Sequence, residues 1–242
     1  MMTIEKGKLY LVTGATGFLG EHLTERILEL GGRVRAFSRN EGKLIILKQR
    51  NPSVEIYTGD VSDWFEVKQA MLGVDAIFHL AALKQVSGVY GATKLLMERL
   101  FLQCEKLNPN TKYRIVRYGN VLYSTGSVLC KWKDLLLEGK QVIVTEPKAT
   151  RFFWTREQAV DLIFSCLEDA NDSTPWVPEM KSMEIGDLLT AMAEKYLPEG
   201  KELNVKYIGL QPAENMHEKI LEEGPASDEV DKFTIEEIRD II

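Results

Sequence analysis

Residues 13–20 read T-G-A-T-G-F-L-G, and this stretch decides the fold that we expect for the chain. It lies between K-L-Y-L-V at residues 8–12, which is typical of a short buried strand, and a run of leucine and isoleucine at near-helical spacing. Gly14 allows a tight turn, Gly17 allows a pyrophosphate to approach the backbone, and Gly20 allows the helix to pack on the strand. The helix N-terminus then faces the negative charge of the phosphates. The stretch therefore predicts a strand–turn–helix unit that binds a dinucleotide.

A second motif, Y-G-A-T-K at residues 90–94, places Tyr90 and Lys94 four residues apart, so that they share one face of a predicted helix. An unperturbed tyrosine has a pKa of about 10, which is too high for a good base at neutral pH. A neighbouring ammonium group favours the phenolate and lowers that pKa. We call the glycine-rich turn at residues 13–20 the cradle. A dinucleotide cradle followed by this pair predicts hydride chemistry.

The end of the second predicted strand, residues 33–37, indicates which dinucleotide is bound. An enzyme that uses NAD usually carries an acid roughly 20 residues beyond the cradle, where it binds the ribose 2′-hydroxyl. Here the strand is followed by Ser38, Arg39 and an asparagine, and the first acid is Glu41. A hydroxyl, a guanidinium and the nearby Lys43 suit a 2′-phosphate instead. We therefore predict NADP as the cofactor.

The composition limits the classes of function. The chain has 242 residues, of which 45% are hydrophobic and 27% charged, with a net charge of -6. This charge argues against a general nucleic-acid or membrane surface, so a phosphorylated ligand must be met by local positive groups. The three cysteines are isolated, which predicts neither a metal site nor a disulfide framework. With no apolar run near the ~20 residues of a membrane span and no signal peptide, we expect a cytoplasmic protein.

Strand and helix patterns alternate through the first half of the chain, with a last strand expected at residues 113–117. This alternation predicts an α/β fold with a Rossmann-like, doubly wound parallel sheet. Beyond it the pattern loosens into shorter elements punctuated by prolines. We therefore predict an NADP-binding domain at residues 1–119, to which residues 140–170 contribute, and a smaller substrate-binding lobe at residues 120–242.

Several further motifs give the chain a family resemblance. It resembles the extended short-chain dehydrogenase/reductases, and within them the nucleotide-sugar 4,6-dehydratases of polysaccharide biosynthesis, most closely the inverting UDP-N-acetylglucosamine 4,6-dehydratase type. The segments that carry the resemblance are T-G-A-T-G-F-L-G, S-R-N-E from Ser38, G-D-V from Gly59, A-A-L-K-Q-V from Ala81, Y-G-A-T-K from Tyr90, R-Y-G-N-V from Arg117, T-R-F-F-W-T from Thr150 and E-N-M-H-E from Glu214.

The resemblance implies a UDP-sugar substrate that is oxidised at C4, loses water across C5 and C6, and is reduced at C6, in a homo-oligomeric enzyme. It implies catalytic roles for Tyr90, Lys94 and Lys84, with Lys84 touching both cofactor and sugar. Residues that bind the sugar nucleotide would be Lys84, Asn120, Arg151 and Glu214. The expected cofactor site comprises Gly14, Thr16, Gly17, Phe18, Leu19, Gly20, Ser38, Arg39, Lys43, Asp60, Val61, Ala81, Lys84, Tyr90, Lys94 and Val121.

The chain departs from the family pattern in three places. Gln211 and Thr125 stand where the family has arginines, which removes two cations expected near the nucleotide diphosphate. Only residues 83–89 separate the fourth strand from the Tyr90 helix, where the family has a helix and a strand that ends in Thr-Asp-Lys, the acid and base of dehydration. A crossover between parallel strands needs a dozen or more residues. We therefore predict that residues are omitted around Val86 to Gly88, so that Cα atoms between Gln85 and Val89 are separated by much more than about 3.8 Å.

Two other functions stay open. A sugar-nucleotide 4-epimerase or reductase would share the cradle, Tyr90 and Lys94, but would not need the Asp/Lys pair. A non-catalytic NADP-binding sensor or scaffold becomes the better interpretation if the short connection is genuine, because the acid and base of dehydration would then be absent.

Overall fold

The computed structural model describes residues 4–81, 89–212 and 214–242 of the chain. It divides into two compact units, one of Met1–Pro109 with Val160–Asn171 and the other of Asn110–Ala159 with Asp172–Ile242. This division does not show which part folds by itself, so the domain boundaries predicted above stay a prediction. The expected separation between Gln85 and Val89 lies outside the described residues.

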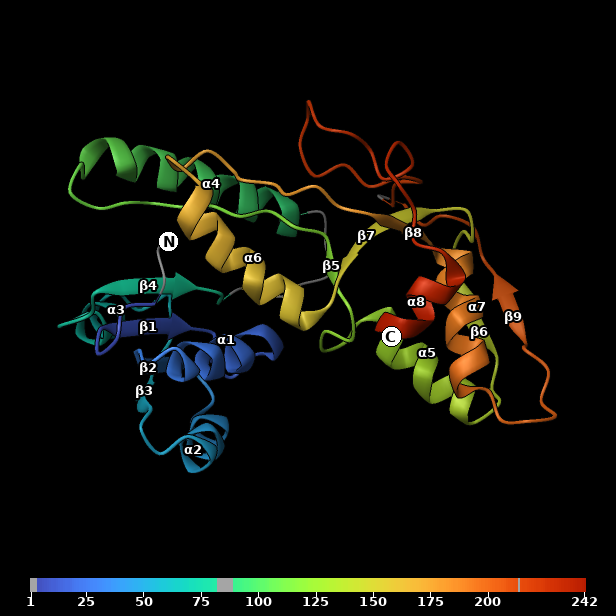
Figure 1. The fold of residues 1–242 in the computed structure, drawn as a ribbon, viewed down its shortest axis with the longest axis horizontal. Coiled ribbons are helices and arrows are strands. Elements are labelled where there is room, and N and C mark those ends of the chain that lie inside the picture. Colours follow the sequence, from blue (N-terminus) through green and yellow to red (C-terminus); the bar gives the residue numbers. More distant parts are fainter. Residues whose placement is uncertain (1–3, 82–88, 213) are drawn as a thin grey trace. The chain divides into compact units, whose positions relative to one another are not determined.

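The first unit contains a parallel sheet of four strands in the order β3-β2-β1-β4 (Figure 1). This arrangement confirms the predicted Rossmann-like α/β fold. The strands are β1 (Leu9–Thr13), β2 (Arg33–Ser38), β3 (Glu55–Thr58) and β4 (Ala76–His79), and the helices are α1 (Phe18–Glu29), α2 (Glu41–Arg50), α3 (Trp64–Ala70) and α4 (Val89–Leu107). Helix α6 (Arg156–Asp169) begins in the second unit and belongs to the first unit from Val160 onward.

Local sequence explains why these elements form. All five residues of β1 are buried, as expected of a central parallel strand that is covered on both faces. Leu23 and Ile27, one helical turn apart on α1, are fully buried and form the apolar face of that helix. Asn40 caps α2, because its side chain accepts a hydrogen bond from the Lys43 backbone N–H at 2.9 Å.

The strand predicted at residues 113–117 is wrong. Among the described residues of this stretch, Val116 forms only an isolated bridge with Trp176. A strand needs a neighbour for its backbone hydrogen bonds. Here the Trp176 N–H donates to the Ile115 carbonyl at 2.8 Å and the Arg117 N–H donates to the Trp176 carbonyl at 3.0 Å, and this single bridge is too short to make a strand.

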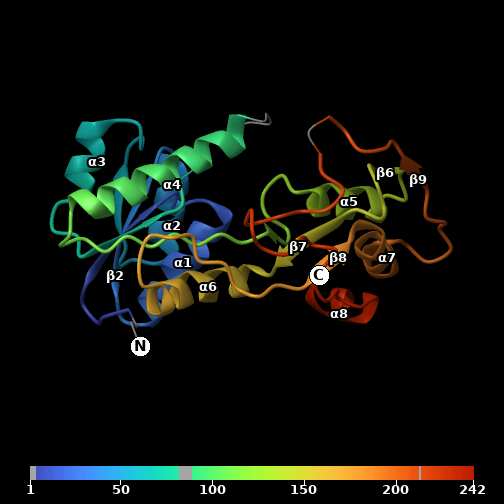
Figure 2. The same cartoon turned by 90° about the horizontal axis from the view of Figure 1, so that it is seen from above.

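The second unit is built from short strands and three helices (Figure 2). β7 (Thr150–Trp154) lies between β5 (Asn120–Val121), to which it is parallel, and β8 (Ser182–Glu184), to which it is antiparallel. A separate parallel pair is formed by β6 (Val142–Val144) and β9 (Val205–Tyr207). The helices are α5 (Val128–Leu137), α7 (Ile185–Tyr196) and α8 (Ile235–Ile241).

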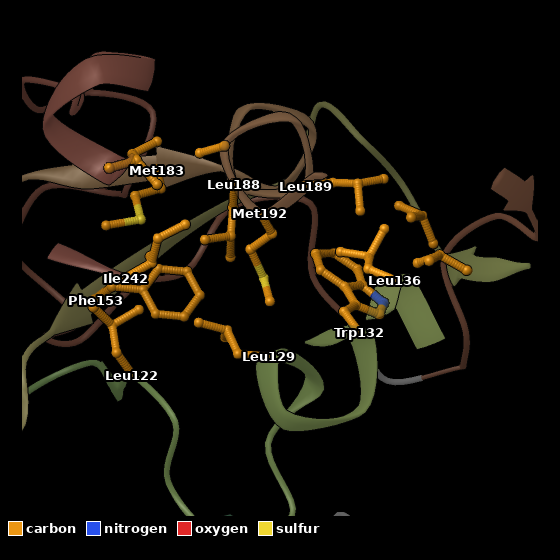
Figure 3. Packing of buried hydrophobic residues seen from close by; sticks show 14 residues of the cluster. Leu122, Leu129, Trp132, Leu136, Phe153, Met183, Leu188, Leu189, Met192 and Ile242 are labelled. Carbon is orange, nitrogen blue, oxygen red and sulfur yellow. The ribbon is translucent and has the colours of Figure 1, made fainter. Parts of the chain in front are cut away.

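The core of the second unit lies between α5 and α7 (Figure 3). Trp132 and Leu129 on α5 and Leu188 and Met192 on α7 are almost completely buried in it. The Trp132 indole N–H donates to the Ile143 carbonyl at 3.1 Å, so this large side chain buries no unpaired donor. Among the described residues, no helix is long and apolar enough to cross a membrane.

Candidate dinucleotide and sugar-nucleotide sites

The turn between β1 and α1 requires glycine at its first position. Gly14 has a φ of +69°, and a Cβ there would lie 2.9 Å from the backbone nitrogen of Ala81. The Gly14 N–H donates to the Phe37 carbonyl at 3.0 Å. The turn is therefore held between the carboxyl ends of β2 and β4, where open parallel sheets bind their ligands.

The other two glycines of the cradle differ from each other. A Cβ at the buried Gly20 would lie 2.2 Å from the Gly14 carbonyl oxygen, so this glycine lets α1 pack directly on the turn. Gly17 is exposed, and a Cβ there would meet only the Gly14 oxygen, at 3.1 Å. The space above Gly17 is therefore where a ligand could approach the backbone, beside Thr16 and the first α1 residues Phe18 and Leu19. This arrangement fits a pyrophosphate at a helix N-terminus.

A shallow hollow of about 580 Å³ lies beside the cradle at the end of β2. It brings together a hydroxyl pair and two cations, because the Thr16 and Ser38 hydroxyls are 2.7 Å apart and Arg39 and Lys43 lie on the rim. One acid, Glu41, also lines it. The surroundings of the hollow suit a phosphate group more than a neutral ribose.

Asp60 lies next to this hollow at the end of β3. Its carboxylate accepts hydrogen bonds from the Ser62 backbone N–H at 2.9 Å and from the Ser62 hydroxyl at 2.8 Å, and Arg39 Nη1 lies 3.6 Å away. These Ser62 hydrogen bonds, and secondarily the Arg39 charge, hold the pKa of Asp60 below its usual value. Asp60 therefore stays ionised and holds Arg39 close to the hollow, while the neighbouring Val61 is exposed.

The carboxyl ends of β1 and β4 are linked through side chains. Thr13 Oγ1 lies 2.9 Å from His79 Nδ1 and accepts a hydrogen bond from the Ala81 N–H at 3.3 Å. Although part of the His79 ring is accessible to solvent, desolvation by the surrounding protein lowers its pKa, and the charge of Lys94 lowers it further. Lys94 on α4 is therefore within electrostatic range of these strand ends, and Tyr90 lies one helical turn before it.

Lys84, the third predicted catalytic residue, lies outside the described part of the chain. The structure therefore brings together Gly14, Ala81 and Lys94 at the strand ends and Thr16, Ser38, Arg39 and Lys43 around the hollow.

Asn120 opens β5, and a glycine before it allows β5 to lie close to β7. A Cβ at Gly119 would be 2.4 Å from the Phe152 carbonyl oxygen. The Asn120 side chain is exposed, and its Nδ2 donates to the Phe152 carbonyl at 3.1 Å and to Glu218 Oε2 at 3.4 Å. The next residue, Val121, is half-buried in the ladder opposite Trp154. Asn120 therefore lies where β5, β7 and residues 216–218 meet.

The other two predicted substrate residues lie around the same segment. Arg151 donates from Nη1 to the carbonyls of Thr150 at 2.7 Å and Met216 at 3.0 Å, and from Nη2 to that of Asn215 at 2.7 Å. Arg151 thus fixes this segment against β7. Glu214 is exposed, and its Oε2 accepts from the Gln211 N–H at 3.0 Å, so its side chain closes a local turn.

Sequence reasoning missed Glu218 at this site. Its Oε2 accepts the Phe152 backbone N–H at 2.9 Å as well as the Asn120 amide. Burial raises the pKa of Glu218, although the Phe152 N–H, Arg151 and Asn120 act in the opposite direction. A signal was present, because Glu218 is the second acid of E-N-M-H-E, of which only Glu214 was singled out.

Residues 87–239 match the model of a family described as polysaccharide biosynthesis protein, which is more than half of the chain. The chain belongs to this polysaccharide biosynthesis protein family. Residues 10–89 match the NAD dependent epimerase/dehydratase family, so the two matches meet at residues 87–89. Together they make the chain an enzyme of the nucleotide-sugar dehydratase and epimerase group, and they confirm the resemblance to extended short-chain dehydrogenase/reductases.

Curated relatives align with most of the length of this chain. An uncharacterised membrane protein of Methanocaldococcus jannaschii is 29% identical over 289 residues, covering 98% of this chain and 85% of the relative. UDP-N-acetylglucosamine 4,6-dehydratase (inverting) of Campylobacter jejuni is 29% identical, and the alignment covers 87% of this chain and 76% of that relative. UDP-glucose 4-epimerase of Rickettsia rickettsii is 27% identical, and the alignment covers 88% of this chain and 77% of that relative. The 289-residue alignment is longer than the 242-residue chain, so that relative contains residues that this chain lacks.

Solved structures share the fold of this chain. The X-ray structure of Pen from Bacillus thuringiensis has a TM-score of 0.88 and 25% identity, covering 99% of this chain and 97% of that chain. UDP-glucose 4-epimerase of Thermus thermophilus in complex with NAD has a TM-score of 0.68 and 15% identity, covering 85% and 88%. At the lower identity the likeness concerns the fold alone.

Proposed function

We propose that this protein is an NADP-dependent nucleotide-sugar 4,6-dehydratase that acts on UDP-N-acetylglucosamine and inverts C5. The observation that carries the proposal is the family match over residues 87–239, which includes Y-G-A-T-K and R-Y-G-N-V, together with a relative of that activity over 87% of the chain. The product would be a 4-keto-6-deoxy sugar nucleotide used in glycan biosynthesis.

The cofactor assignment is supported by the turn and the hollow. Gly17 leaves room for the pyrophosphate, and Ser38, Arg39 and Lys43 would hold a 2′-phosphate at the hollow beside it. Asp60 pairs with Arg39, so it orients this cation and is not offered to a ribose hydroxyl. When bound, a nicotinamide dinucleotide supplies an acceptor and donor of hydride.

The protein's own residues would transfer protons and bind the substrate as follows. Tyr90 would accept the proton of the sugar C4 hydroxyl, and the ammonium of Lys94 would favour its phenolate form. A ketone at C4 acidifies the proton at C5, whose loss expels the C6 hydroxyl as water. Asn120, Arg151 and Glu214 would bind the sugar nucleotide. Lys84 would position the sugar or act in the elimination.

We further propose that the protein's complete form contains an extra helix and strand near residues 86–88, bearing the acid and base of elimination. Two observations support this. A relative aligns over more residues than this chain contains. The four-stranded sheet of the first unit ends at β4, whose described partner is β1, so a further parallel strand could pair at this edge. The alternative function is a sugar-nucleotide 4-epimerase, which the Rickettsia relative favours and which needs no acid and base for elimination.

The test is to incubate the purified protein with UDP-N-acetylglucosamine and NADP and to identify the products by mass spectrometry and NMR. Loss of one water supports the dehydratase, and a product of unchanged mass but inverted C4 supports the epimerase. Binding of NADP and UDP-N-acetylglucosamine without a product supports the sensor or scaffold. Tyr90→Phe should retain NADP binding and lose turnover, since it removes the phenolic proton acceptor and little volume. Near-normal turnover of this variant would contradict the oxidation step.

A further inference from the structure

We infer that Glu218 is a positioning residue that fixes the side-chain amide of Asn120, so that Asn120 offers its carbonyl oxygen Oδ1 to a hydrogen-bond donor of the sugar nucleotide. The inference rests on the proposed function in one respect, namely that Asn120 binds the sugar nucleotide. It adds the residue that orients Asn120 and the chemistry that Asn120 recognises, an N–H or O–H group of the ligand.

The orientation of Asn120 follows from what surrounds its amide nitrogen. The NH₂ group has two hydrogens, and the structure pairs it with two acceptors, the Phe152 carbonyl at 3.1 Å and Glu218 Oε2 at 3.4 Å. A flipped amide would place Oδ1 against both acceptor oxygens and leave no donor between them. Among the described residues, no hydrogen bond reaches Oδ1, and the Asn120 side chain is exposed. Oδ1 is therefore the group available to a ligand.

Glu218 is held firmly enough to act as this anchor. Its Oε2 accepts the Phe152 N–H at 2.9 Å, so one carboxylate oxygen joins β7 to Asn120. Its backbone N–H donates to Ser227 Oγ at 2.7 Å, and its carbonyl accepts the Ser227 N–H at 2.9 Å. Ser227 and Thr150 are both buried, and their hydroxyls are 2.6 Å apart. The anchor thus belongs to a connected polar network in which each member limits the others.

A carboxylate suits this role better than an amide. Ionised Glu218 has only acceptors, so it admits one orientation of the Asn120 amide. A glutamine at this position would keep its carbonyl oxygen toward the Phe152 N–H, but it is neutral, so the hydrogen bond that it accepts from the Asn120 amide is weaker than the charge-assisted bond to a carboxylate. Glu218→Gln should therefore keep the volume and the fold while weakening the preference of the Asn120 amide for this orientation. Glu218→Ala should weaken that preference further, because among the described residues the Phe152 carbonyl then remains as the one acceptor of the Asn120 amide.

The first measurement needs no ligand. Side-chain amide signals of Asn120, assigned with Asn120→Asp, are recorded by ¹⁵N NMR in the wild type, Glu218→Gln, Glu218→Ala and the control Glu222→Gln, which changes an exposed acid four residues away. We expect slow proton exchange of the Asn120 amide in the wild type and the control, and faster exchange with shifted signals in both Glu218 variants. Unchanged Asn120 signals in folded Glu218→Gln, or equal changes in Glu222→Gln, would overturn the inference.

The second measurement uses turnover of UDP-N-acetylglucosamine. Loss of a well-oriented hydrogen bond should raise KM about tenfold in Glu218→Gln and change kcat less than about twofold. A fall in kcat with KM unchanged would contradict a role in orienting Asn120 toward the substrate. If the wild type neither binds nor converts this substrate, the proposed function fails, and the NMR result still decides whether Glu218 orients Asn120.

Discussion

Replacing Gly20 with alanine perturbs the contact on which the cradle geometry depends. Gly20 lies in the first turn of α1, and an added Cβ would be 2.2 Å from the Gly14 oxygen and 2.8 Å from the Ala15 Cα. Both obstacles are backbone atoms of the turn, which cannot move aside as a flexible side chain can. The helix must therefore shift away from the turn, and the N-terminus of α1 moves with it.

The size of the effect follows from two opposing contributions. Overpacking in a close-packed region costs about 1–3 kcal/mol, and backbone obstacles place this site near the upper end. Alanine gains about 0.5–1 kcal/mol over glycine inside a helix. We expect a net loss of about 2 kcal/mol in the free energy of unfolding. For a chain of this size, that corresponds to a decrease in Tm of about 4–8 °C.

Gly42→Ala is the matched control, because Gly42 also lies in the first turn of a helix, α2. A Cβ there would meet only Asn40 Oδ1, at an ordinary 3.6 Å. This variant should leave Tm unchanged or raise it by a few degrees. Thermal and urea unfolding of both variants, with NADP binding by calorimetry, test the reasoning. If Gly20→Ala were as stable as Gly42→Ala, the close approach of α1 to the turn would be refuted.

Three further predictions concern the cofactor and the polar network. Gly17→Ala should lower stability less than Gly20→Ala, because its Cβ meets only one atom, at 3.1 Å. It should nevertheless weaken NADP binding at least about tenfold, because the added methyl group occupies the space expected for the phosphates. An NADP affinity equal to that of the wild type would contradict the proposed phosphate site. Arg39→Ala should weaken NADP binding much more than NAD binding, and equal losses would remove the 2′-phosphate assignment. Because burial raises the pKa of Glu218, the folded state binds the proton of this carboxyl more tightly than the unfolded state does. The free energy of unfolding of the wild type should therefore fall relative to that of Glu218→Gln as the pH rises above 4.5, and it should level off above the folded-state pKa. A difference in unfolding free energy that does not change with pH would contradict this.

The elements that depend on local chemistry were predictable from the sequence. The β1–α1 turn is recognisable because both of its requirements are local: Gly14 adopts a positive φ, and Gly20 leaves no room for a Cβ against the turn. Helix α5 (Val128–Leu137) is recognisable because its apolar residues recur at helical spacing. The C-terminal helix α8 was not predicted, although its capping box of Thr234 and Glu237 was a readable signal.

Features that depend on distant partners were not predictable. Residues 113–117 read Y-R-I-V-R, whose aromatic and β-branched residues are typical of a strand, but strand formation requires a neighbour, and the described contact is one isolated bridge between Val116 and Trp176. Strands such as β5 and β8 are too short to show a period. Glu218 matters because it meets Asn120, which lies 98 residues earlier in the chain, and no local pattern reports such a contact.

The most direct test of the central claim follows the hydrogen at C4 of the substrate. UDP-N-acetylglucosamine carrying deuterium at C4 is incubated with the protein and NADP, and the product is analysed by NMR and mass spectrometry. The proposed dehydratase should deliver the deuterium to C6 of the same molecule, in a product that has lost one water. Deuterium that stays at C4 of an epimerised sugar, or that passes into the free cofactor pool, would contradict it.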